Sequence, residues 1–359
     1  MKKNIKRAIA VLLSLVIILV VGLGAVIMVA AVTDYKPQDE TLLEYEVGED
    51  NMTIETDKEY SIVTYNIGYA ALGKDQDFFM DGGTGKGAKT KDEVENNIAA
   101  ITDYIHGLLP DFVFLQEVDI KAKRSFGINE LDRFLDGNYS SVFGMNYKVK
   151  YVPVPIPIFN AMGGVESGIV TLSKSHPTSA MRYNFDGKEM YLQQLFDLDR
   201  CFTITRFDTE NDRELVLINA HFSAFDKGGT VREQQLKQMQ KILLDEQSKG
   251  NYVILGGDFN HELPGTSSSN FTWKGEYPEW CMILPDDFAP DGYGWANDSK
   301  SPTCRAVDKM YVEGENFLAV LDGFLISDNV GIVSVKNRGD FDFENSDHNP
   351  VEFVFKLKN

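Results

Sequence analysis

The chain has 359 residues, of which 43% are hydrophobic and 25% charged, so that one large domain or two small ones can form around a sizeable core. Acidic residues outnumber basic ones by 54 to 35, which gives a formal net charge of −19 at pH 7. Nucleic-acid-binding proteins usually present a basic surface, because contacts with phosphates supply most of their affinity, so this composition counts against nucleic acid as a general partner.

The N-terminal segment, residues 1–33, predicts a membrane anchor. Four basic residues precede the uncharged run Ala8–Val32, which spans about 37 Å as a helix and is long enough to cross a bilayer. A cleaved signal peptide is the alternative, but its apolar core is usually shorter, roughly 7–15 residues. Basic residues before the run and acidic residues after it place the N-terminus in the cytoplasm. We therefore expect a single-pass protein of the cell membrane, with the remaining chain outside the cytoplasm.

Residues 34–58 are polar and acidic and predict a linker, whereas residues 59–359 predict one folded domain. Within the domain, short apolar runs alternate with amphipathic stretches. The runs of strand type are Ser61–Asn66, Asp111–Gln116, Ser167–Ser173, Glu214–Ala220, Tyr252–Gly256, Leu321–Ser327 and Val351–Leu357. This alternation predicts an α/β domain with layered, mixed sheets.

Two amphipathic stretches predict helices. Thr90, followed three residues later by Glu93, is typical of a capping box at a helix start. Apolar residues then recur at helical spacing, at Val94, Ile98, Ile101 and Ile105. A second helix is expected over about residues 231–248.

Polar residues recur at the ends of the predicted strands. They are Asn66, Gln116-Glu117, His221, Asp258 with Asn260, Asp322, and Asp347-His348. A charged or imidazole side chain directly after an apolar run is costly to bury unless it is paired or binds a metal. One such residue often does no more than end a strand, but six such positions together indicate a shared polar site.

The ordered set of these residues resembles the endonuclease/exonuclease/phosphatase superfamily over roughly residues 59–359. Its most specific parts are GGDFN at 256–260 and SDHNPV at 346–351. The resemblance implies a four-layer α/β/β/α sandwich of two mixed sheets, with the active site at one end of the paired sheets. It also implies a phosphate-ester substrate.

The site suits a hard divalent cation. Glu117 with Asn66 offers the carboxylate and carbonyl oxygens that Mg²⁺ prefers, and the resemblance adds Asp347 as a further ligand. We therefore expect Mg²⁺ as cofactor, with Mn²⁺ as a substitute. Zinc is not expected, because the set lacks a cysteine ligand and a histidine-rich cluster. The three cysteines are far apart in sequence and are expected to be buried thiols without a chemical role: Cys201, Cys281 and Cys304.

The resemblance also implies individual catalytic roles. Asp258 would position or deprotonate the attacking water, and Asn260 would hold the phosphate. His348 would pair with Asp322, whose carboxylate fixes the imidazole tautomer. His221 matches the second histidine of the deoxyribonuclease and sphingomyelinase branches. Whether His348 acts as a base or as a phosphate clamp stays open at this point.

Several further features have two interpretations each. Arg305 either reaches a substrate phosphate or forms a structural salt bridge, and His261 either lines the pocket or lies at the surface. The three tryptophans between Asn270 and Ala296 either contact an apolar substrate or membrane, or pack a small separate core. Tyr151–Phe159 contains three prolines, which favour an extended edge or loop with an apolar lip.

The leading hypothesis is an extracytoplasmic, Mg²⁺-dependent phosphodiesterase that acts on a lipid head group or another small phosphate ester. A surface nuclease is one alternative, and an inositol-phosphate phosphomonoesterase is another. The second is weakened because Cys304 stands where that branch has an aspartate before its arginine. A non-catalytic surface binding module is the alternative from a different class. No protein partner is predicted.

Overall fold

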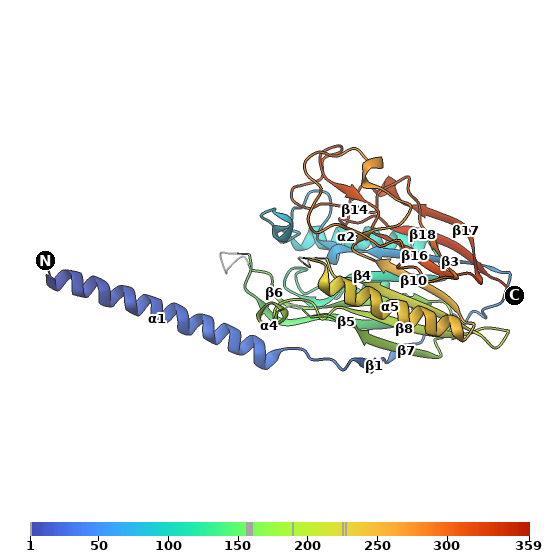
Figure 1. Cartoon of the computed structure of the whole chain (residues 1–359), viewed down its shortest axis with the longest axis horizontal. Helices are drawn as coiled ribbons and strands as arrows, with labels where there is room; N and C mark the ends of the chain where they lie inside the picture. Colours follow the sequence, from blue (N-terminus) through green and yellow to red (C-terminus); the bar gives the residue numbers. More distant parts are fainter. Residues whose placement is uncertain (1, 156–160, 189, 225, 227) are drawn as a thin grey trace.

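The N-terminal apolar run forms the helix α1 (Lys2–Thr33), which projects from a layered domain (Figure 1). The computed structural model describes residues 2–155, 161–188, 190–224, 226 and 228–359. Among these residues, α1 is the one helix long and apolar enough to cross a membrane. Most of its large apolar side chains are exposed, which suits a segment surrounded by lipid.

Two mixed sheets of seven strands form the domain. The first sheet contains, in spatial order, β1 (Glu40–Leu42), β7 (Ser179–Asn184), β8 (Cys201–Asp208), β9 (Glu214–His221), β10 (Tyr252–Asp258), β16 (Asp322–Ser327) and β13 (Tyr293–Ala296). The second sheet contains β17 (Val330–Asn337), β18 (Val351–Leu357), β3 (Glu59–Asn66), β4 (Phe112–Ala122), β6 (Gly163–Ser173), β5 (Ser140–Val152) and β2 (Tyr45–Glu46). Within the described residues, β3 pairs with β4 and β9 with β10 in parallel, and the other neighbours are antiparallel.

The apolar core between the sheets follows from strand alternation. Successive side chains of a strand point to opposite faces, so Ile62 of β3 packs between the sheets, whereas Val63 packs on the outer face. Phe112 and Phe114 of β4 join Ile62 in the inner core. Polar links cross between the sheets near the site: Gln116 Nε2 donates to Asn219 Oδ1 at 2.9 Å, and Asn219 Nδ2 donates to the Val170 carbonyl at 2.8 Å.

Each outer face is covered by a long helix. α2 (Lys91–Leu108) packs on the second sheet, and α5 (Thr230–Ser248) packs on the first. The capping box is present, because Thr90 Oγ1 accepts from the Glu93 amide at 3.3 Å, and the four predicted apolar residues of α2 are buried. The four-layer α/β/β/α sandwich expected from the sequence is therefore confirmed.

The segment between the anchor and the domain joins both sheets. β1 pairs with β7 at one edge of the first sheet, and β2 pairs with β5 at one edge of the second. Part of the acidic segment 34–58 is thus continuous with the fold. The remaining short elements are α3 (Leu131–Phe134), α4 (Tyr191–Gln194), β11 (His261–Glu262), β12 (Met282–Ile283), β14 (Cys304–Arg305) and β15 (Leu318–Ala319).

All three tryptophans are half-buried; two of them pack a small separate core, as the second interpretation has it, although Trp280 also lines the cavity described below. Trp273 and Trp280 pack against Phe317 in a separate apolar cluster, and Trp295 packs against Phe259. All three cysteines are buried free thiols, as expected.

Candidate active site

The polar strand ends meet at one end of the paired sheets. Because β9 and β10 are parallel, His221 and Asp258 lie side by side at their carboxyl ends. β16 runs antiparallel to β10, so its first residue, Asp322, lies opposite Asp258. The parallel pair β3–β4 brings Asn66 beside Gln116 in the second sheet.

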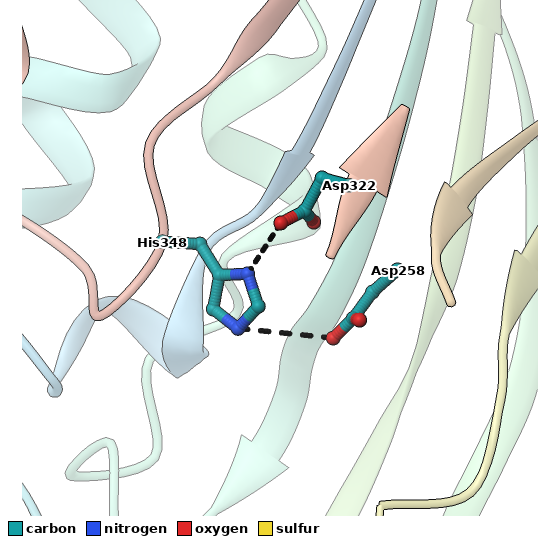
Figure 2. Close-up of side chains that lie close together, drawn as sticks. All are labelled: Asp258, Asp322 and His348. Atoms are coloured by element: carbon teal, nitrogen blue, oxygen red, sulfur yellow. Dashed lines mark hydrogen bonds and ion pairs between the residues drawn. The ribbon is translucent and has the colours of Figure 1, made fainter. Parts of the chain in front are cut away.

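A buried histidine lies between two carboxylates (Figure 2). His348 Nδ1 is 2.8 Å from Asp322 Oδ2, and because a carboxylate only accepts, Nδ1 carries the proton. His348 Nε2 faces Asp258 Oδ2 at 3.7 Å. The predicted pairing of His348 with Asp322 is therefore present, with the other ring nitrogen turned toward Asp258.

The charge state of His348 is set by these neighbours. Burial lowers the pKa of His348, but the charge of the Asp322 carboxylate raises it by more, with smaller contributions from Cys304 and Asp258. The pKa therefore lies well above its ordinary value. These neighbours therefore favour the protonated imidazole. A cationic ring donates hydrogen bonds from both nitrogens.

Asp258 is held by two donors. Its Oδ1 accepts from the Asn260 amide at 2.8 Å, and its Oδ2 accepts from Asn66 Nδ2 at 3.0 Å. Burial raises the pKa of Asp258 to about 6, against the opposing effect of His348. Asp258 is therefore ionised over much of the neutral range and is suited to accept a proton from a bound water.

Glu117 reaches the site through an irregularity in β4. The register between β4 and β6 shifts between Leu115 and Val118, and Glu117 has a φ of 57°, which is uncommon for a residue other than glycine. Burial and the nearby Asp347 carboxylate raise the pKa of Glu117 to about 7. Such local strain is typical of positions that a functional site requires.

The carboxylates of this corner suit a divalent cation. The half-buried Glu117 and the buried Asp347 lie near each other, and desolvation is the largest cause of the raised pKa of each. A cation between them would offset this cost, and both offer hard oxygen atoms. Asn66 presents its amide nitrogen to Glu117 at 3.4 Å, while its oxygen accepts from the Gly68 amide at 3.0 Å, so its role as a ligand stays a prediction.

A second group of potential ligands consists of Asp258, Asp322 and His348, whose nearest donor atoms all lie within 4.8 Å of one another. Nδ1 of His348 is already bonded to Asp322, which leaves fewer free donor atoms than at Glu117 and Asp347. The protein thus holds acidic and histidine groups that fit a divalent metal, with Glu117 and Asp347 as the better pair.

His221 and Asn260 also lie close to Asp258. His221 Nε2 is 3.5 Å from Asp258 Oδ2 and 3.8 Å from Glu117 Oε1, and burial lowers the pKa of this histidine well below its ordinary value. Its Nδ1 is buried without a hydrogen-bond partner among the described residues. Asn260 Nδ2 donates to the Phe222 carbonyl at 2.8 Å, which fixes the side chain at the pocket floor.

The two predicted substrate-binding residues are tied to the backbone. Arg305 is buried, and its terminal nitrogens donate to backbone carbonyls that include those of Leu72 at 3.1 Å and Gly73 at 2.9 Å. Arg305 therefore holds the backbone of another loop, a role that differs from both sequence interpretations, a substrate phosphate contact and a structural salt bridge. Arg305 also lines the pocket. His261 is buried rather than at the surface, and its Nδ1 donates to the Phe259 carbonyl at 2.6 Å. A contact of either residue with substrate stays a prediction.

One basic residue of the pocket escapes sequence reasoning. Arg200 lines the pocket, and its Nη1 is buried without a hydrogen-bond partner among the described residues. Its positive charge partly offsets the rise in the pKa of Glu117 that burial causes. The same charge adds to the lowering of the pKa of His221 by burial. It directly precedes β8 and belongs to no motif, so only the fold reveals that it faces the site.

These residues form the floor of a cavity of about 610 Å³. Glu117, His221, Asp258, Asp347 and His348 all line it. Other parts of its lining carry apolar side chains such as Phe78 and Phe196, and the lining reaches Asp34–Pro37, directly after α1. The arrangement combines a metal-binding corner, an acceptor for a proton and two cationic donors, which together suit cleavage of an anionic ester.

Comparison with known proteins gives a consistent result. Residues 63–342 match a family model described as Endonuclease/Exonuclease/phosphatase family. No curated protein matches the sequence.

Solved structures share the fold. An endonuclease/exonuclease/phosphatase from Beutenbergia cavernae DSM 12333 is 18% identical, with a TM-score of 0.57, covering 84% of this chain and 72% of that one. ANGEL2, a 2',3'-cyclic phosphatase, in complex with adenosine-2',3'-vanadate, is 14% identical, with a TM-score of 0.54, covering 88% and 99%. D. rerio TDP2 complexed with single strand DNA product is 15% identical, with a TM-score of 0.52, covering 84% and 100%.

Proposed function

Because this chain belongs to the endonuclease/exonuclease/phosphatase family, whose members hydrolyse phosphoester bonds, we propose that it is a Mg²⁺-dependent phosphodiesterase. Its substrate is a lipid head group or another small phosphate ester outside the cytoplasm. The observation that carries the proposal is the meeting of the His348–Asp322 pair with Asp258 on the floor of one cavity.

The geometry favours a division of roles among these residues. Asp258, held by Asn66 and by the Asn260 amide, accepts the proton of the attacking water. His348, kept cationic by Asp322, donates from Nε2 to a phosphoryl oxygen and so acts as the phosphate clamp. Arg200, with a free buried nitrogen, supplies a second positive charge to the phosphate.

Glu117 and Asp347 would hold the metal ion. When bound there, Mg²⁺ would neutralise charge on the phosphoryl oxygens and position the ester. Mn²⁺ has the same preference for oxygen ligands and would substitute for it. The chain's own contribution is to hold both carboxylates, Glu117 half-buried and Asp347 buried, in the lining of the cavity.

The membrane location rests on α1. Basic residues precede its apolar part and acidic residues follow it, which favours a domain outside the cytoplasm. The acidic composition disfavours the nuclease alternative, even though TDP2 was solved with single-stranded DNA product. A non-catalytic module is disfavoured because five of the predicted strand-end residues, Glu117, His221, Asp258, Asp347 and His348, line one cavity.

The test is hydrolysis by the purified full-length chain in detergent. The panel is bis(p-nitrophenyl) phosphate, p-nitrophenyl phosphate, plasmid DNA, a choline phospholipid and a phosphoinositide, each with Mg²⁺ and with EDTA. We expect metal-dependent turnover of a diester, and a loss of about 10²–10⁴-fold in the His348→Ala variant. His106→Ala, which changes a partly exposed histidine far along α2, is the matched control. Equal rates for both variants, or no turnover by folded, metal-loaded protein, would overturn the proposal.

A further inference from the structure

The cavity above the catalytic floor extends to the point where the chain leaves α1. Asp34–Pro37, the four residues directly after the helix, line it. They are held in place, because Asn184 Nδ2 donates to the Pro37 carbonyl at 3.3 Å and the Arg182 guanidinium lies 5.9 Å from the Tyr35 ring centroid. The juxtamembrane segment is therefore part of the cavity wall.

Helix length places this wall close to the membrane. The apolar part of α1 ends at about Thr33, and four residues of extended chain reach at most about 14 Å. α1 also contacts β5, and Ala30 near its C-terminal end is buried. Figure 1 shows α1 projecting from the side of the domain where α4 and the ends of β5 and β6 lie. The juxtamembrane side of the cavity therefore lies within about 14 Å of the bilayer core, or about twice the thickness of one head-group region.

Much of the cavity lining is apolar. Phe78, Phe79, Val152, Met162 and Phe196 all line it, on three different segments of the chain. Polar side chains of neighbouring positions, among them Gln193 and Asp197, also line it. A small soluble phosphate ester would leave these apolar side chains facing water, whereas an acyl or glycerol-linked chain would cover them.

Exposed apolar side chains continue from these walls to the surface. We call Met80, Val154, Met190 and Leu192 the apolar rim; their exposed fractions are 50%, 38%, 79% and 56%. Met80 and Val154 also line the cavity, whereas Met190 and Leu192 lie outside its lining, on the segment that leads to Phe196. Soluble surfaces seldom gather large exposed apolar residues around a cavity unless the region contacts a partner or a membrane.

We propose that the substrate is a phospholipid of the leaflet that the domain faces, an inference that rests on the function proposed above. The apolar rim sits in the bilayer interface, and the phosphodiester reaches Asp258 and His348 on the floor. The glycerol and the first part of the acyl chains lie along the wall of Phe78, Val152 and Phe196. The anchor keeps this opening at the membrane surface, so the lipid enters without leaving the bilayer completely.

The test uses the full-length chain reconstituted into vesicles that contain phospholipids with choline, ethanolamine, glycerol and inositol head groups. Release of a water-soluble, phosphate-containing head group is followed by mass spectrometry. Leu192→Glu places a charge on the rim, and Leu244→Glu is its matched control, because Leu244 is 51% exposed on α5, which contributes no residue to the apolar rim. Both variants are also assayed with soluble bis(p-nitrophenyl) phosphate.

We expect Leu192→Glu to reduce head-group release at least tenfold, with the soluble diester hydrolysed at an unchanged rate. Leu244→Glu should match the unmodified protein in both assays. Turnover of the soluble diester without release of any head group would overturn this inference and leave the proposed phosphodiesterase in place. Equal vesicle rates for the two variants would also overturn it. Failure of both assays would overturn the proposed function itself.

Discussion

Replacing Asp322 by asparagine tests whether the carboxylate sets the charge of His348. Asp322 Oδ2 lies 2.8 Å from His348 Nδ1, and both side chains are buried. For charge centres about 4 Å apart and an effective dielectric constant of about 20, the attraction is about 4 kcal/mol. Because this attraction favours the protonated ring, Asp322→Asn should lower the pKa of His348. The ring then loses its charge near neutral pH and can no longer clamp the phosphate.

The expected result is a fall in kcat/KM for bis(p-nitrophenyl) phosphate of about 10²–10³-fold, because each 1.36 kcal/mol corresponds to a factor of ten. The variant should stay folded, since asparagine has nearly the same shape. Two readouts separate this role from a structural one: the melting temperature, and the chemical shifts of the His348 ring nitrogens, which report protonation. Asp286→Asn, at an exposed aspartate, is the control. A kcat/KM within threefold of the unmodified protein, or a ring still protonated in Asp322→Asn, would refute this reasoning.

Three other predictions concern the metal, the pH dependence of stability and the core. Glu117→Gln should weaken Mn²⁺ binding at least tenfold by titration calorimetry, because one of two carboxylates is removed; unchanged affinity would place the ion elsewhere. Burial opposes ionisation of Glu246, but hydrogen bonds from Arg206 and Asn251 lower its pKa to about 2. Its stabilisation should therefore be complete above about pH 4.5 and lost as the pH falls toward 2, and Glu246→Gln should abolish this part of the urea-unfolding pH profile. Phe112→Ala should reduce the free energy of unfolding by about 3–5 kcal/mol, and a loss below 1 kcal/mol would contradict its place between the sheets.

The sequence predicts the central strands well, because strands buried on both faces leave continuous apolar runs. Glu214–Ala220 and Tyr252–Gly256 differ from β9 and β10 by no more than two residues at their ends. β5, in contrast, is among the longest strands and was not predicted. It mixes lysines, serines and a glycine with apolar residues, and its extended form depends on pairing with β6, which the local sequence does not encode.

The candidate site likewise has residues that the local sequence predicts and residues whose position depends on the tertiary fold. The strand-end residues are visible because a polar side chain after an apolar run is unusual, and the resemblance adds the pairing of His348 with Asp322. The turn of Glu117 into the site depends on the irregular register of β4, which no sequence pattern announces. Arg200 faces the cavity only because β8 lies beside β9, and this neighbourhood is set by the tertiary fold.

β1 and β2 also decide where the soluble part of the protein can begin. Each completes the edge of one sheet, so a fragment that began at residue 59 would leave the backbone of β7 and part of β5 without hydrogen-bonding partners. Open edges of this kind pair readily with other chains, and such a fragment would be prone to aggregate. A fragment without α1 should therefore begin before residue 40, so that both of these sheet edges stay paired.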